Sequence, residues 1–166
     1  MDRGKNFFLE QDILDLTNCL RVVANPADEI GLFGLLRSPF FGVSDDELLS
    51  MRAAEGGLAP PEALARIGKL REFREELATD RILARFVDET GFLSTPDPKV
   101  RANVDKFLHL MRSLDEAGHA TLEDKLRFIE QQRESGREPN APLVEVADAV
   151  QILTVHSAKG LEFPVV

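Results

Sequence analysis

A regular spacing of apolar residues between about residues 97 and 117 limits the possible folds more than any other part of the chain. Apolar side chains recur there at spacings of four, three, one, three and three, at Val100, Val104, Phe107, Leu108, Met111 and Leu114. Residues three and four apart lie on the same face of an α-helix, so the segment predicts an amphipathic helix. Gly118 is expected to end this helix, because glycine adopts the left-handed backbone of helix C-termini at little cost.

Similar spacing, with start and stop signals, recurs along most of the chain. Further helices are predicted over 10–24, from Pro26 to Leu36, after Ser44, from Pro60 to Leu77, from Asp80 to Gly91, and from Thr121 to Gly136. Asn25 is expected to cap the second of these, with Pro26 at its first position and its apolar residues, Ile30 among them, buried on most sides. Asp80 and Thr121 are expected to cap the helices that begin with them. The predicted fold class is therefore mainly α, a bundle of helices with one short strand segment at the C-terminal end.

The pattern divides the chain into four parts. Residues 1–9, with Asn6–Leu9 as either a short strand or a lead-in, are expected to be a cut edge of another domain, in which no core could begin. Residues 10–136 form the helical domain, 137–149 a polar linker with Pro and Asn, and 150–166 part of an α/β domain. This order is what a helical domain inserted into an α/β domain would produce.

The last part combines an apolar run with a small polar loop. Val150 to Val155 is β-branched and apolar, which predicts a buried strand. The loop His156–Gly160 carries short donors, and Gly160 leaves the backbone free to turn several N–H groups toward an anion. On the residues alone, a loop of this kind is more often an ordinary strand end than a binding site.

The run Thr154-Val-His-Ser-Ala-Lys-Gly-Leu-Glu-Phe163 resembles motif V of the UvrD/Rep group of superfamily 1 DNA helicases. The resemblance implies a segment of the second RecA-like domain, between ATP and the translocating strand. It implies that Thr154, His156 and Ser157 face the DNA, that Gly160 and Glu162 face the nucleotide, and that Lys159 lies between them.

A second resemblance lies about a hundred residues earlier. Asn25-Pro-Ala-Asp28, followed by Leu36-Arg-Ser-Pro-Phe-Phe-Gly-Val-Ser-Asp-Asp-Glu-Leu48, is similar to the opening of the helical 2B insertion of the same helicases. The pattern is closest to the AddA/RecB (exonuclease V beta-like) branch. The resemblance implies an ATP-dependent DNA helicase of recombination or double-strand-break repair, with ATP and Mg²⁺ as cofactors. The partners that it implies are single-stranded DNA, duplex DNA and a second subunit of a helicase-nuclease complex.

Composition limits what the chain does alone. Its net charge of −9 opposes binding to phosphate, and the motif G-x-x-x-x-G-K-[ST] that cradles ATP phosphates is absent from the sequence. We therefore expect this chain alone to bind DNA poorly and not to hydrolyse ATP. No apolar run reaches the ~20 residues of a membrane span and no secretion signal precedes the helices, so a cytoplasmic location is expected.

Several local features have structural explanations. Cys19 continues an apolar stripe and is expected to be buried, and the Phe residues are expected to pack rather than stack on bases. Ser44 and Glu47 hold the reciprocal positions of a capping box, which is favoured over a magnesium-binding Asp-Glu pair. His109 and His119 have no partner in sequence, and neither Glu75-Glu76 nor Asp88-Glu89 has a neighbouring His or Cys for a metal site.

Two other functions stay open at this point. The chain could be a helical protein-interaction module with no enzymatic activity, in which the C-terminal loop is incidental. It could also be a free-standing phosphate-binding enzyme that uses Lys159 and Gly160.

Overall fold

The computed structural model describes residues 7–53, 59–94, 97–119 and 121–135. These contain seven α-helices and two 3₁₀ turns, and no strand among the described residues. The elements are η1 (Phe7–Leu9), α1 (Gln11–Ala24), α2 (Glu29–Arg37), α3 (Asp45–Ala53), α4 (Pro61–Glu72), η2 (Phe73–Glu75), α5 (Thr79–Glu89), α6 (Pro98–Glu116) and α7 (Leu122–Ser135). The predicted mainly α fold is confirmed, whereas the predicted strand at 150–155 lies outside the described residues.

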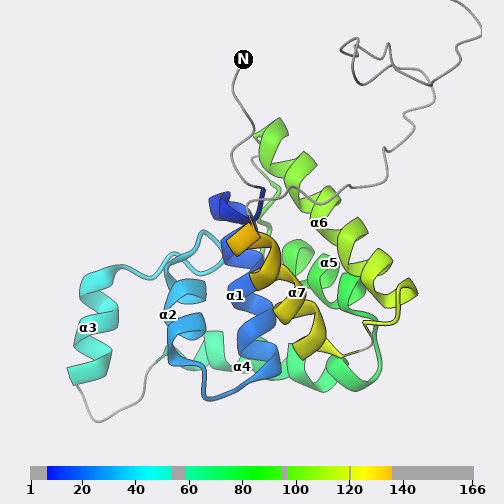
Figure 1. Cartoon of the computed structure of the whole chain (residues 1–166). Helices are drawn as coiled ribbons and strands as arrows, with labels where there is room; N and C mark the ends of the chain where they lie inside the picture. The colour runs from blue at the N-terminus through cyan, green and yellow to red at the C-terminus, as the bar shows by residue number, and fades with distance from the viewer. Residues whose placement is uncertain (1–6, 54–58, 95–96, 120, 136–166) are drawn as a thin grey trace, which may run out of the picture.

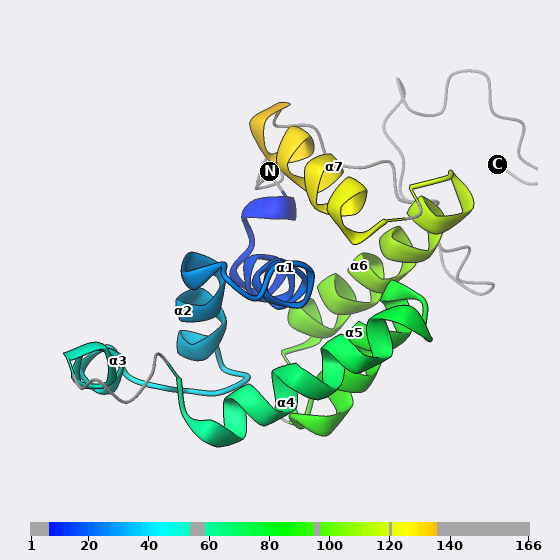
Figure 2. The ribbon, with the colours of Figure 1, turned by 90° about the horizontal axis from the view of Figure 1, so that it is seen from below.

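Helix α1 is the centre of the bundle. It packs against η1, α2, α4, α6 and α7, which surround it in both ribbon views (Figures 1 and 2). Most of its apolar residues and also Asp12, Asp15 and Thr17 are buried. A helix covered on most sides by other helices buries polar positions as well as its apolar stripe, so its polar groups need partners inside the protein.

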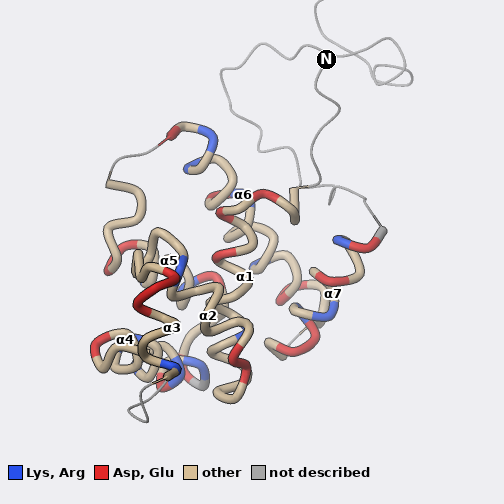
Figure 3. The backbone as a smooth tube through the Cα atoms, turned by 90° about the vertical axis from the view of Figure 1, so that its left-hand side faces the viewer, with Lys and Arg blue, Asp and Glu red and all other residues tan. Residues whose placement is uncertain are grey.

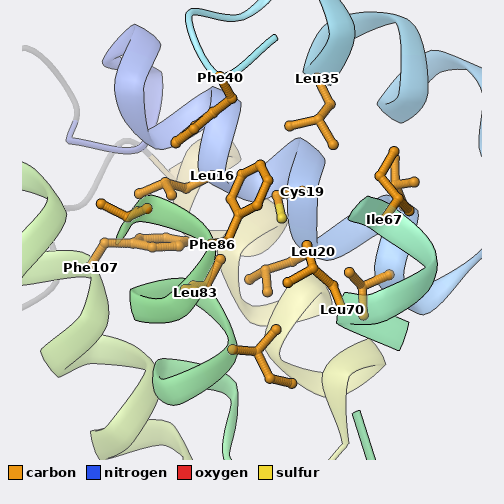
Figure 4. Close-up of a cluster of buried hydrophobic side chains, with 14 of the residues drawn as sticks. Leu16, Cys19, Leu20, Leu35, Phe40, Ile67, Leu70, Leu83, Phe86 and Phe107 are labelled. Atoms are coloured by element: carbon orange, nitrogen blue, oxygen red, sulfur yellow. The ribbon is translucent and has the colours of Figure 1, made fainter. Parts of the chain in front are cut away.

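The core lies between α1 and the helices around it. Figure 4 shows side chains from α1, α2, α4, α5 and α6 meeting there, among them Leu16, Cys19, Leu20, Leu35, Ile67, Leu70, Leu83, Phe86 and Phe107. Phe40 packs on Phe86 and Phe92, with ring centroids 4.6 and 4.2 Å away. The predicted burial of Cys19 is confirmed, and the phenylalanines of the core serve packing as expected.

The connection between α1 and α2 differs from the prediction. Asn25 is the C-cap of α1, and its side-chain oxygen accepts from the Ala27 N–H at 3.0 Å. The N-cap of α2 is Asp28, whose Oδ1 accepts from the Gly31 N–H at 2.8 Å and which also accepts two hydrogen bonds from Arg21. Asp28 is the better cap here because its negative charge is matched both by the helix N-terminus and by a guanidinium.

Asp28 also shows how burial and bonding compete. Burial by itself raises the pKa of Asp28, but the bonds from Gly31 and Arg21 outweigh it and hold the pKa below its usual value. The carboxylate therefore stabilises the α1–α2 hairpin in its ionised form. Gly34 lets the two helices approach closely, because a Cβ there would collide with the side chain of Asn18.

Three other predicted helix ends are confirmed. The Ser44 N–H donates to Glu47 at 2.9 Å and the Glu47 N–H donates back to Ser44 Oγ at 3.3 Å, which is the capping box of α3. Thr121 caps α7 through the Asp124 N–H at 3.1 Å. Gly118 closes α6 with φ at 90°.

Four further predictions were wrong. Phe7 and Phe8 form a 3₁₀ turn rather than a strand and are buried, so the helical core already includes residues before 10. Asp80 lies inside α5 rather than at its N-cap, Ala78. The helix expected to reach Leu77 ends at Glu72 and continues as η2. Ile30 in α2 is 75% exposed rather than buried.

Helix α3 stands apart from the bundle (Figures 1 and 2). Leu48 is its one buried residue among those described, and Leu49 is exposed on it. It follows the turn at Phe40–Val43, and the exposed Arg37–Asp45 ion pair, at 2.6 Å, joins its first residue to the end of α2. This helix therefore contributes little to the core.

Candidate functional site

The residues predicted to contact DNA and nucleotide lie outside the described residues. They are Thr154, His156, Ser157, Lys159, Gly160 and Glu162. Their roles stay predictions, and the site chemistry that the structure does describe belongs to the helical bundle.

The two ends of the bundle lie side by side. Helix α7 contacts η1, and the orange end of α7 lies next to the blue turn in both ribbon views (Figures 1 and 2). Phe7 is fixed there by the rings of Phe8 and Phe107, and the ammonium of Lys106 lies 4.4 Å from its ring centroid. The chain therefore joins the bundle and leaves it at one corner.

The C-terminus of α1 is held by two arginines. Arg71 donates from Nε and Nη2 to the Val22 carbonyl at 3.2 and 3.0 Å, and Arg74 donates to the Ala24 carbonyl at 3.1 Å. Arg74 also binds Glu123 of α7 at 2.8 Å. These guanidiniums satisfy carbonyls that a helix end leaves unpaired, so they connect α1 to α4, η2 and α7 rather than forming a surface for phosphate.

Lys125 lies almost completely inside the bundle, with 2% of the residue exposed. Its ammonium donates to Thr79 Oγ1 at 2.7 Å and to Asp115 Oδ1 at 2.5 Å. Asp115 Oδ2 is buried and has no hydrogen-bond partner among the described residues. Beside this group Asp80 accepts from Arg112 at 2.7 Å, so the start of α5 is connected to α6 and α7 by charges.

A pocket of about 560 Å³ lies between the start of α1, the turn after α5 and the start of α6. Carboxylates of Glu10, Asp12, Asp15 and Asp97 line it, and the one lysine at its edge, Lys99, is paired with Glu10 at 2.8 Å. Four carboxylates against one lysine give this recess a net negative lining, and we call it the acidic pocket.

Two of its carboxylates come from neighbouring turns of α1. Burial raises the pKa of Asp15, the hydrogen bond from Gln11 lowers it, and the charge of Asp12 raises it again, with a net rise. This pair was not among the residues predicted from the sequence. The signal was present, since Asp12 and Asp15 flank the buried Ile13 and Leu16 and are therefore drawn into the interior with them.

No cluster of three or more His, Cys, Asp or Glu side chains in the described residues could hold a metal ion. His109 is exposed, and His119 lies against Phe128 with ring centroids 5.7 Å apart. Acidic and basic residues are interspersed along the helices (Figure 3). Among the helices that the structure describes, none has the length and apolar character that crossing a membrane requires.

Comparisons with known proteins identify the family. Residues 65–166 match the family described as UvrD-like helicase C-terminal domain. Similar proteins include three that are each named as one subunit of an ATP-dependent helicase/nuclease. That of Acetivibrio thermocellus is 29% identical over 191 residues, which covers 99% of this chain and 15% of the relative. Those of Oceanobacillus iheyensis and Geobacillus thermodenitrificans are 30% and 32% identical, each covering 99% of this chain and 16% of the relative.

The chain thus spans about a sixth of the length of these relatives. The match includes the run Thr154–Phe163, on which the resemblance to helicase motif V depends. Since the family match covers more than half of the chain, the chain belongs to the UvrD-like helicase C-terminal domain family.

Proposed function

We propose that this chain is the helical insertion and the first motor segment of an ATP-dependent DNA helicase that works in recombination or double-strand-break repair. The observation that carries the proposal is the family match over 65–166, which includes the motif-V-like loop. The relatives' name, which describes one part of an ATP-dependent helicase/nuclease, supports the same activity.

In this proposal the loop at 154–162 couples the nucleotide to the strand. Thr154, His156 and Ser157 contact the DNA, while the Gly160 backbone and the Glu162 carboxylate contact the nucleotide. Lys159 lies between the two ligands. A loop that contacts both can change its grip on DNA when ATP is bound and hydrolysed. ATP and Mg²⁺ would bind mainly to parts of the polypeptide outside this chain, since no phosphate-cradling motif is present in its sequence.

The adjacency of η1 and α7 supports an inserted helical unit. An insertion must return the chain near its starting point, so that the host domain continues its own path. The proposed unit runs from Phe7, rather than from residue 10, to 136, because Phe7 and Phe8 belong to its core. Residues 137–149 and 150–166 are then the proposed linker and the proposed host segment.

The test uses the polypeptide that carries this chain between the flanking regions seen in its relatives. We expect His156→Ala and Lys159→Ala to reduce DNA-stimulated ATP hydrolysis and strand unwinding by at least about tenfold, because removing one group that acts in the transition state has effects of this size or larger. The matched control is His109→Ala, since His109 is exposed on α6. Unchanged unwinding in both loop variants would contradict the proposal.

The relatives are named as one subunit of their enzyme, which supports one further part of the proposal, that the polypeptide works with a second subunit. The alternative is a helical protein-interaction module with no enzymatic activity. The two differ in a direct measurement: the module would show no DNA-stimulated ATP hydrolysis in the longer polypeptide, with or without a partner.

A further inference from the structure

The acidic pocket contains two polar atoms that have no partner in the described structure. Asp12 is 9% exposed, and its Oδ2 is buried without a hydrogen bond. Asn103 Nδ2, on the facing helix α6, is also buried without a hydrogen bond. Both residues line the same pocket, and one atom accepts while the other donates.

A buried carboxylate oxygen without a partner destabilises the folded state, because it loses its hydrogen bonds to water and forms none inside the protein. Two donors that line the pocket are already used. Lys99 binds Glu10 at 2.8 Å, and Gln11 donates to Asp15 Oδ1 at 2.8 Å. Lys99 also attracts Asp12 and Asp97, but one cation beside four carboxylates leaves the pocket an excess of negative charge.

A ligand that fits the pocket would bring a cation with several hydrogen-bond donors for the carboxylates and a neutral acceptor for Asn103 Nδ2. The described side chains form no metal-binding group, which disfavours a metal ion as the occupant. An arginine in a polypeptide offers a planar guanidinium with five donors for Asp12 and Asp15, and backbone carbonyls for Asn103. Pro39, Phe92 and Val100 supply apolar walls for the aliphatic part of its side chain.

We propose that the acidic pocket binds an arginine side chain of another polypeptide. Guanidinium is favoured over ammonium because two carboxylates three residues apart on α1 suit a forked donor, and because a guanidinium is more easily taken out of water. Binding would also relieve the repulsion between Asp12 and Asp15, which contributes to the raised pKa of Asp15. The proposal does not depend on helicase activity.

The test titrates the full chain of 166 residues with acetyl-Gly-Arg-Gly-amide, followed by calorimetry and by NMR shifts of the pocket residues. Acetyl-Gly-Gln-Gly-amide is the matched neutral ligand. We expect the arginine peptide to bind and the glutamine peptide to bind at least about tenfold more weakly, the factor expected from losing one charged hydrogen bond. Equal binding of the two peptides, or no binding of the arginine peptide, would overturn the proposal.

Variants separate binding from folding. Asp12→Asn should weaken arginine-peptide binding by about tenfold or more, because it removes the charge that the pocket offers. The same change should raise the melting temperature by about 2–4 °C, because it removes the repulsion between Asp12 and Asp15. Glu62→Gln is the control, since Glu62 is exposed on α4 outside the pocket. A lower melting temperature of Asp12→Asn with unchanged binding would show a purely structural role and refute the proposal.

Discussion

Replacing Lys125 with methionine tests how charges connect α5, α6 and α7. Methionine keeps the length of the side chain but removes its charge and donors. In the unaltered protein Lys125 donates to Asp115 Oδ1, while Asp115 Oδ2 has no hydrogen-bond partner among the described residues. The substitution therefore leaves both carboxylate oxygens of Asp115 without a hydrogen bond. Breaking a buried ion pair by removing one partner typically costs about 3–5 kcal/mol.

The exposure of Asp115 reduces that cost. Its side chain is 32% exposed, so water hydrates part of the carboxylate once Lys125 is gone. The bond to Thr79 is lost in the same step and is already part of that cost, because one ammonium makes both contacts. We place the loss in unfolding free energy at about 2–3 kcal/mol, or a fall in melting temperature of roughly 4–12 °C.

Urea denaturation at neutral pH, followed by far-UV circular dichroism, measures this free energy. The matched variant combines Lys125→Met with Asp115→Leu, which replaces the pair by apolar groups. We expect it to recover at least half of the loss, because no buried charge is left unpaired. A single variant within about 0.5 kcal/mol of the unaltered protein, or a double variant as unstable as the single one, would refute the reasoning.

Three further outcomes follow from the structure. Asp28→Asn should lower stability at neutral pH but not in strong acid. The pKa of Asp28 is lower in the folded protein than in the unfolded chain, so its carboxylate stabilises the fold at neutral pH and loses this effect as the pH falls through the pKa of the folded state. Denaturation of both proteins at a series of pH values from neutral to strongly acidic measures the difference. Gly118→Ala should lower the free energy of unfolding by about 1 kcal/mol, because Gly118 has a φ of 90° that alanine rarely adopts. Gly68→Ala should raise it by about 0.5–1 kcal/mol, because Gly68 lies inside α4 with open space at its Cβ; urea denaturation measures both. Cys19 should resist thiol reagents until the chain unfolds, because complete burial raises the pKa of its thiol.

Local signals predicted those parts of the fold in which neighbouring residues satisfy one another. The capping box of Ser44 and Glu47 and the glycine that ends α6 depend on contacts within a few residues, so the sequence alone identifies them. The predicted spacing of α6 is also confirmed, because its buried face follows one regular period.

The errors came from partners far apart in sequence. Asp80 resembled a helix cap, but its carboxylate binds Arg112, thirty-two residues away. Phe7 looked like part of a cut edge, yet it packs on Phe107. The acidic pocket escaped notice for the same reason, since Asp12 and Asn103 meet only when α1 and α6 pack together. Periodicity predicts which face of a helix is buried but not which distant residue covers it.

The central position of α1 has a consequence for synthesis of the protein. During synthesis α1 leaves the ribosome before α6 and α7, which cover two of its sides. Until residue 135 has left the exit tunnel, the apolar surface of α1 that α7 will cover has no native partner, so nascent chains of this protein are the form most exposed to aggregation and to chaperones.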